Sequence, residues 1–295
     1  MMYRRIFLCV SFLFSCAGAG FAEKAVPLES DQQISDFSLA GYGEKGKKSW
    51  DLAGKTADIF SDVVKLKDIV GNFYAENDTI RLVADKGDFN KADGKVHLQQ
   101  NVVVTTSSGT KMSTDALDWD RKKNMVMTDE LVNIEKANMV SVAQGAQGEP
   151  NLNKVTLLKD VQVNFNPEAK TPEENGLKNK IVITCDGPLE VDYAKNVAVF
   201  KNNVKVVNQD SEIYSDQMDV YFNKGAKNKD AAQQNNDLVA TKVDRIVARG
   251  NVKIVRGENI SYSEEAVYTS GDRKITLSGK PKLVIYSTEG LHASP

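Results

Sequence analysis

The chain has 295 residues, of which 41% are hydrophobic and 26% charged, and 38 Lys and Arg face 40 Asp and Glu for a formal net charge of −2. With no basic excess to neutralise phosphates, the composition excludes most nucleic-acid-binding proteins. The 2 histidines and 3 cysteines leave few side chains for metal or thiol chemistry.

The N-terminus has the three-part pattern of a secretory signal peptide. Arg4-Arg5 precedes the apolar run Ile6–Phe14, and small residues follow as far as Ala22. We predict that residues 1–22 are a signal peptide. The apolar part would be roughly 25 Å long as a helix, which is shorter than the ~30 Å hydrocarbon core. The two alternatives are a retained inner-membrane anchor and lipidation at Cys16.

Six segments beyond the leader repeat one pattern. Each contains an alternating strand, a charged turn, a second alternating strand and a dipeptide ending in Val that opens a third strand. The marker valines are Val102, Val132, Val161, Val204 and Val252. Their spacings are 30, 29, 43 and 48 residues, and the two long intervals contain polar insertions at 166–180 and 223–242. A period near 30 predicts stacked units that bury their core by stacking.

Apolar residues occupy every second position in these segments, which is typical of strands with one apolar and one polar face. Turn signals such as Ala92-Asp93-Gly94 separate the strands. The sequence therefore predicts an all-β fold, a two-sheet repeat of short antiparallel strands around an apolar interior. The residues expected to face that interior are Leu117, Trp119, Met125, Met127, Val197, Val199, Met218, Val220, Phe222, Ile254 and Ile275.

No catalytic motif, metal-ligand set or cofactor motif is recognised, so we predict no enzyme activity, no metal and no cofactor. Asp recurs at positions 85, 115, 186 and 216, where we expect it to open turns by hydrogen-bonding the local backbone. The alternative is a cation ladder or an acid pair. His97 should lie on the polar face and Cys185 in the core, where it would be the lone cysteine after cleavage.

The C-terminal repeats resemble a known family. Val247–Val255, followed by Glu264–Tyr268 and Ile275–Gly279, is similar to the OstA-like domain of the LptA family, which transports lipopolysaccharide in the periplasm. Asn203–Val206 and Tyr214–Met218 resemble the preceding repeat of that domain.

The N-terminal half resembles the partner family, LptC. The similar segments are Phe37–Tyr42, Trp50–Ala57, Ala84–Phe89, Val103–Gly109 and Thr114–Trp119.

The resemblance implies an open β-jellyroll with two modules in one chain. The expected domains are the signal peptide, an LptC-like module at 23–165, an LptA-like module at 181–286, and a tail at 287–295. The two polar insertions lie between the modules and within the second one.

The resemblance also implies a periplasmic bridge that shields lipopolysaccharide acyl chains between the inner and outer membranes. Its expected partners are lipopolysaccharide, the inner-membrane lipopolysaccharide ABC transporter complex and the outer-membrane lipopolysaccharide assembly protein.

The last strand should also support head-to-tail self-association, because an unpaired edge invites strand addition. The edge residues are Lys282, Leu283, Val284, Ile285 and Tyr286.

Two alternatives come from other functional classes. One is an extracellular structural or adhesive β-solenoid. The other is a β-helix carbohydrate-active enzyme, which would need paired carboxylates such as Asp85/Asp88 or Asp216/Asp219.

Overall fold

The computed structural model describes residues 30–43, 46–74, 79–136, 139–165, 180–223, 242–272 and 274–286. Within these ranges the chain forms a single 17-stranded sheet and no α-helix. The strands are β1 (Gln32–Tyr42), β2 (Lys48–Ile59), β3 (Val63–Tyr74), β4 (Thr79–Asn90), β5 (Lys95–Thr106), β6 (Thr110–Asp120), β7 (Met125–Lys136), β8 (Met139–Gly148), β9 (Lys154–Phe165), β10 (Ile181–Cys185), β11 (Leu189–Asp192), β12 (Val197–Val207), β13 (Glu212–Asn223), β14 (Lys242–Arg256), β15 (Asn259–Thr269), β16 (Lys274–Ser278) and β17 (Lys282–Val284).

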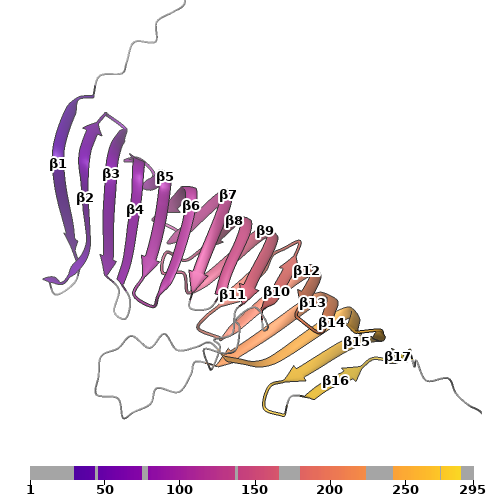
Figure 1. Ribbon diagram of the computed structural model, residues 1–295. Coiled ribbons are helices and arrows are strands. Elements are labelled where there is room, and N and C mark those ends of the chain that lie inside the picture. The colour runs from indigo at the N-terminus through magenta and orange to yellow at the C-terminus, as the bar shows by residue number, and fades with distance from the viewer. Residues whose placement is uncertain are drawn as a thin grey trace, which may run out of the picture.

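The sheet is an antiparallel meander in which strands follow one another in chain order (Figure 1). At two positions a pair of short strands replaces one long strand. β10 and β11 both lie between β9 and β12, and β16 and β17 both pair with β15. The all-β prediction is therefore confirmed.

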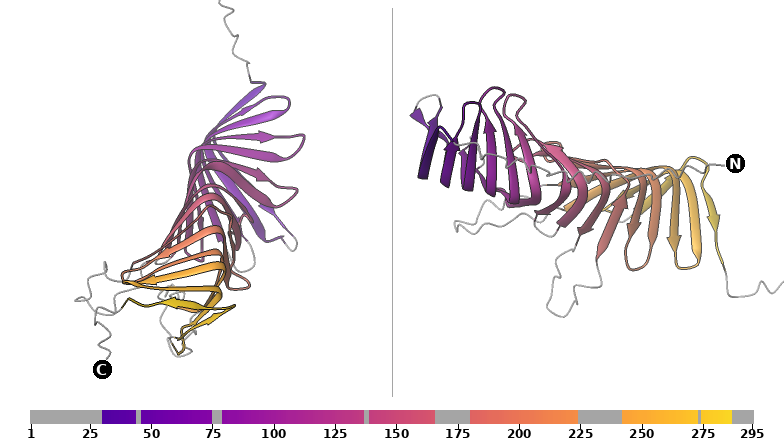
Figure 2. Two further views of the ribbon diagram at one scale, coloured as in Figure 1. Left: turned by 90° about the vertical axis from the view of Figure 1, so that its right-hand side faces the viewer. Right: turned by 90° about the horizontal axis from the view of Figure 1, so that it is seen from above.

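The strands stand side by side across a long axis, from β1 at one end to β17 at the other (Figure 2). The strand direction changes along that axis, as the twist of a large sheet requires. No other layer covers the sheet in the described ranges, yet one of its faces is buried. The sheet must therefore fold over on itself, and its inner face forms the core.

Bends in the middle of the strands produce this folding. In β5, Gln100 and Asn101 have φ values of 65° and 51°, and in β12 Asn202 and Asn203 have φ values of 63° and 52°. The left-handed region turns the chain without ending the strand, and the ladder continues past each bend after a shift of register. Each long strand thus contributes to both arms of the folded sheet.

The repeat unit differs from the expected one. The predicted unit has a second and a third strand separated by the dipeptide that ends in Val, but in the first repeat one continuous strand, β5, covers both. The Val-marked dipeptide is a bend and not a turn, so each repeat is a hairpin of two long strands. The sequence signal was ambiguous because Asn and Gly favour turns and left-handed bends alike.

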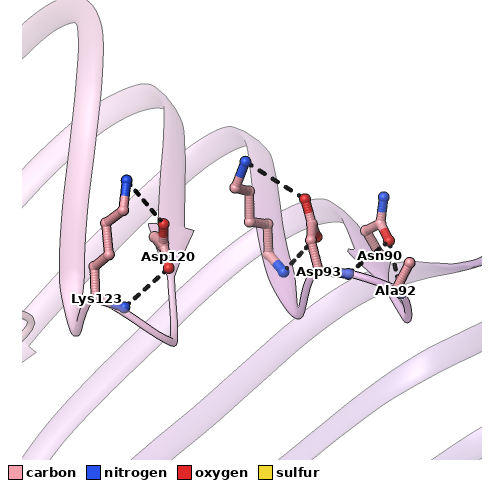
Figure 3. Close-up of polar contacts among 6 residues, drawn as sticks. Asn90, Ala92, Asp93, Asp120 and Lys123 are labelled. Carbon is pink, nitrogen blue, oxygen red and sulfur yellow. Dashed lines mark hydrogen bonds and ion pairs between the residues drawn. The ribbon is translucent and has the colours of Figure 1, made fainter.

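Hairpin turns at the ends of the strands are closed by short polar side chains (Figure 3). The Asn90 side chain accepts a bond from the Ala92 N–H at 2.9 Å, and Asp120 accepts one from the Lys123 N–H at 3.0 Å. The backbone bonds to Asp93 and Asp120 lower the pKa of both carboxyl groups. These side chains accept hydrogen bonds from backbone N–H groups that have no partner in the strand ladder.

The marker valines lie at the centre of the core. Their exposed fractions are 0% for Val102 and Val132, 2% for Val161, and 1% for Val204 and Val252. The apolar core in which they lie contains residues from Phe37 to Ala266. The stacking predicted from the period is therefore the way in which this chain buries its apolar surface.

Several expectations fall on residues outside the described ranges. They are the signal peptide at 1–22, the tail at 287–295 and nearly all of the insertions at 166–180 and 223–242. The sheet itself continues across the expected module boundary, because β9 pairs with both β10 and β11.

Candidate functional site

The larger hollow of the folded sheet has a volume of about 410 Å³ and extends from β6 to β16. Its walls are mostly aliphatic and aromatic side chains, including Ile183, Leu189, Phe200, Met218 and Ile246. The volume lies in the range of about 300–1,000 Å³ that is typical of ligand pockets. The hollow can therefore hold apolar groups that need protection from water.

A smaller hollow of about 160 Å³ lies in the N-terminal half. Phe73, Leu117, Trp119 and Val126 line it. The Phe73 and Trp119 rings meet edge to face with their centroids 4.9 Å apart, a favourable aromatic geometry. The buried Trp119 Nε1 has no hydrogen-bond partner within the described chain.

Polar side chains are few on the walls of the larger hollow. Lys136 lines the hollow, and its Nζ lies 3.7 Å from the centroid of the Tyr193 ring. Burial raises the pKa of Tyr193 to about 12, so this phenol remains neutral at physiological pH. Burial also raises the pKa of the Cys185 thiol. Apart from Lys136, the residues that line the larger hollow are uncharged, as a site for hydrocarbon requires.

The outer face is polar and cross-linked by ion pairs. Arg249 contacts Asp219 at 2.5 Å and Glu265 at 3.2 Å, and Lys201 contacts Glu190 at 2.7 Å. The Arg245 guanidinium lies 4.4 Å from the Tyr221 ring centroid. The sheet thus has an apolar inner face and a charged outer face.

Most of the residues expected to face the interior do so. The following line a hollow: Leu117, Trp119, Met218, Val220, Phe222, Ile254 and Ile275. Met218 and Leu117 are only 1% exposed, whereas Ile275 on β16, near the end of the sheet, is 49% exposed.

The other four expected interior residues lie on the outer face, so their assignment was wrong. Val197 pairs with Tyr221 and Val199 with Asp219, whereas Ala198 and Phe200 line the larger hollow. Each run has apolar residues at consecutive positions, so alternation alone fits either face.

The same error affects β7. Met127 pairs with Asp118 and Met125 with Asp120, whereas Val126 faces Trp119 and lines the smaller hollow. Met127 is 37% exposed.

A signal in the sequence could have corrected these assignments. In the second strand of a repeat, inward positions lie an even number of residues before the marker valine. Val126 lies six residues before Val132, and Phe200 lies four before Val204. In the first strand of a repeat the bend shifts the alternation by one residue. Thr114 and Leu117, on either side of the bend in β6, are both buried although they are three residues apart. Counting from the marker valine would have selected the right face.

Three of the four recurring aspartates contact the next bent strand and do not close turns. Asp85 accepts a hydrogen bond from the Asn101 amide at 2.7 Å, and Asp216 accepts one from Asn251 at 2.9 Å. Asp186 is held in the same way. These carboxylates therefore join neighbouring bent strands, which corrects the expectation that they bond the local backbone.

The histidine and cysteine expectations agree with the structure. His97 lies on the polar side, 2.7 Å from Asp118, and Cys185 is buried in the core. The carboxylates of Asp216 and Asp219, which a carbohydrate-active enzyme would need, are bonded to Asn251 and Arg249 respectively. Among the described residues no group of three or more His, Cys, Asp and Glu side chains is placed to hold a metal ion.

The expected edge strand is present. β17 pairs with β15 alone among the described strands, through Tyr262, Ser261 and Ile260. Ile285 and Tyr286 lie just beyond β17 and are exposed. No helix in the described part of the chain is long and apolar enough to span a membrane.

The folded sheet and its apolar interior define an open β-jellyroll. Residues 6–166 match the family described as lipopolysaccharide-assembly, LptC-related, and residues 186–291 match the family described as LptA/(LptD N-terminal domain) LPS transport protein. The chain belongs to the LptC-related family, and it joins an LptA-like module to it. No curated protein matches the chain. The families indicate a lipopolysaccharide transport protein.

Proposed function

We propose that this protein is a periplasmic bridge that shields lipopolysaccharide acyl chains inside the folded sheet between the inner and outer membranes. The observation that supports this most directly is the larger hollow. It is lined from β6 to β16, so both family modules contribute to one apolar wall. A carrier that hands lipid from one module to the next needs such continuity.

The energetics favour acyl chains as the occupant. Each CH₂ removed from water contributes about 0.8 kcal/mol, so several chains along the interior provide substantial binding free energy. A charged group in the same place would lose its hydration with few partners to compensate for it. The amphipathic lipid would keep its head group near the polar rim, where Asn208 and Ser211 line the hollow.

The partners follow from the two ends of the sheet. Among the described strands β1 pairs with β2 only, and β17 pairs with β15 only, so both ends present open ladder groups. We propose that the β1 end docks on the inner-membrane lipopolysaccharide ABC transporter complex. The Lys282–Tyr286 end would dock on the outer-membrane lipopolysaccharide assembly protein or on a second copy of this chain.

Adjacent aromatic residues on opposite faces allow a direct test. Phe222 lines the larger hollow, whereas Tyr221 contacts Arg245 on the outer face. The photoreactive residue p-benzoylphenylalanine replaces each of them in turn in cells. Irradiation should yield a lipopolysaccharide adduct from position 222 and little from position 221, with the adduct identified by mass. Equal yields at both positions, or none at 222, would refute an interior lipid path.

A further inference from the structure

The turn between β8 and β9 reaches into the interior. Residues 149–153 connect Gly148 to Lys154, and Leu152 within this turn is only 2% exposed. The Leu152 side chain lines both the larger and the smaller hollow. Pro150 from the same turn also lines the smaller hollow. This turn therefore lies where the two spaces meet.

The turns between β4 and β5 and between β6 and β7 are polar and exposed instead. Lys91 and Ala92 are exposed in the β4–β5 turn, and Arg121 and Lys122 are exposed in the β6–β7 turn. Leu152 differs in burial, and it is also a bulky residue at a position of positive φ, where the other two turns have Gly94 and Asn124. Its φ is +56°, a left-handed conformation that bulky residues rarely adopt. The surrounding structure must hold this conformation against its steric cost.

Backbone hydrogen bonds hold the turn in place. The Glu149 N–H donates to the Lys154 carbonyl at 3.0 Å, and the Leu152 N–H donates to the Glu149 carbonyl at 2.9 Å. The Tyr193 N–H, at the neighbouring end of β11, donates to the Asn153 carbonyl at 2.9 Å. The turn is thus fixed both to its own hairpin and to the first strand pair of the LptA-like module.

We propose that Leu152 divides the interior into two compartments, so that at equilibrium the acyl chains occupy the larger, C-terminal one and the smaller one is occupied only during passage from the β1 end. This inference rests on the proposed function. The larger hollow of about 410 Å³ has the volume of an ordinary ligand pocket, whereas the smaller one of about 160 Å³ lies below the range of about 300–1,000 Å³. The acyl chains of a multi-chain lipid can extend into the smaller hollow only if the two hollows are connected. Leu152 is therefore a specificity-determining residue for acyl-chain position.

A matched pair of phenylalanines reports the two compartments. Phe73 lines the smaller hollow and Phe222 the larger one, and both side chains are half-buried. The purified full chain with p-benzoylphenylalanine at either position is mixed with purified lipopolysaccharide and irradiated. We expect several-fold more adduct from position 222 than from position 73.

Truncation of Leu152 should then join the compartments. Leu152→Ala should raise the adduct yield at position 73 several-fold. Leu189→Ala is the matched control, because Leu189 is also 2% exposed but lines only the larger of these two hollows. It should leave the yield at position 73 unchanged. Leu152→Asn serves as a second variant, since Asn readily adopts positive φ and keeps the turn if the alanine variant fails to fold.

Three outcomes would overturn the proposal. Equal wild-type yields at positions 73 and 222 would show that Leu152 does not partition the lipid, while leaving the lipid path itself supported. The same would follow if Leu152→Ala and Leu152→Asn changed the yield at position 73 no more than Leu189→Ala. No adduct at either position would contradict the proposed function, and the partition of acyl chains would fall with it.

Discussion

The bend of β14 shows how single residues support the folded sheet. Gly250 and Asn251 have φ values of +74° and +48°. A Cβ on Gly250 would lie 2.4 Å from Asp216 Oδ2, so only glycine allows the close approach of the two strands. Asn251 combines a tolerated left-handed backbone with the amide that donates to Asp216 at 2.9 Å.

Two substitutions at Asn251 should separate these contributions. Asn251→Gly removes the hydrogen bond but keeps the backbone freedom, and should lower the free energy of unfolding by about 1 kcal/mol. Asn251→Ala also forces a Cβ into the left-handed region and should cost about 1 kcal/mol more. Urea unfolding measures both. If the alanine variant were as stable as the glycine variant, the left-handed backbone conformation at position 251 would carry no steric cost.

A polar cluster on β2 and β3 should make stability depend on pH in the acid range. Asp51 accepts hydrogen bonds from Asn72 and Tyr74 at 2.7 Å and from Lys48 at 2.9 Å. These bonds lower the pKa of Asp51 from 3.8 to about 2. Because the pKa of Asp51 is lower in the folded than in the unfolded chain, the unfolded chain binds more protons at pH values between the two pKa values. The stabilisation is therefore complete above about pH 4 and is lost as the pH falls towards 2.

The Asp51→Asn variant should lack this dependence. Its unfolding midpoint in urea should fall less steeply than that of the wild type as the pH is lowered through this window. Asp31→Asn, at an exposed position just before β1, controls for the change in net charge. A wild-type slope that persists in Asp51→Asn would assign the acid sensitivity to other carboxylates.

At the scale of elements, the edge strands determine what can be added to the sheet. Leu283 and Ile285 are 60% and 71% exposed at the C-terminal edge, and Ile34 and Leu39 are 45% and 53% exposed in β1. Exposed apolar side chains beside unpaired ladder groups are typical of strands that pair with another chain. Natural edges that avoid such pairing usually present charged residues instead.

Charges at the C-terminal edge should therefore weaken association. The double substitution Leu283→Lys and Ile285→Lys should shift head-to-tail association to higher concentration without lowering stability, because both side chains are already exposed. Sedimentation at increasing concentration measures this. Tyr262→Lys changes an exposed residue of the neighbouring strand β15 and should have no such effect. A wild type that remains monomeric throughout would contradict self-association through this edge.

The strands themselves were largely predictable, but their faces were not always. Met218, Val220 and Phe222 alternate with polar or amphipathic neighbours, so one phase fits and the prediction was right. Met125-Val126-Met127 is apolar throughout, so local alternation has no preferred phase. The pairing of Val126 with Trp119 decides it, because a shift of one residue moves every side chain to the other face.

At the scale of the whole molecule, the junction between the two modules is built like the rest of the sheet. β9 pairs with β10 from Phe165 to Val161 and with β11 from Leu157 to Lys154. Side chains from both strands, including Val163 and Ile183, line the same hollow. The modules therefore share one interior and one ladder.

Cleavage between the modules should leave them together. A protease site introduced within residues 166–179 would cut the connection between β9 and β10, and the two fragments should still co-elute in gel filtration. The paired strands and the buried apolar wall hold the halves together. Ile183→Asp would place a carboxylate in that wall and should release the fragments after cleavage. Separation of the wild-type fragments would show that the covalent link is required.

The sequence by itself determined the all-β fold and the period of the repeat, because period-two alternation and a fixed spacing can be read along the chain without knowing its fold. It also placed His97 outside and Cys185 inside. The tertiary structure decided which turn-like signals are bends within long strands, and which face Val197 and Met127 take. It also decided that Leu152 enters the interior. Those features depend on the pairing of neighbouring strands, which the alternation within one short segment does not specify.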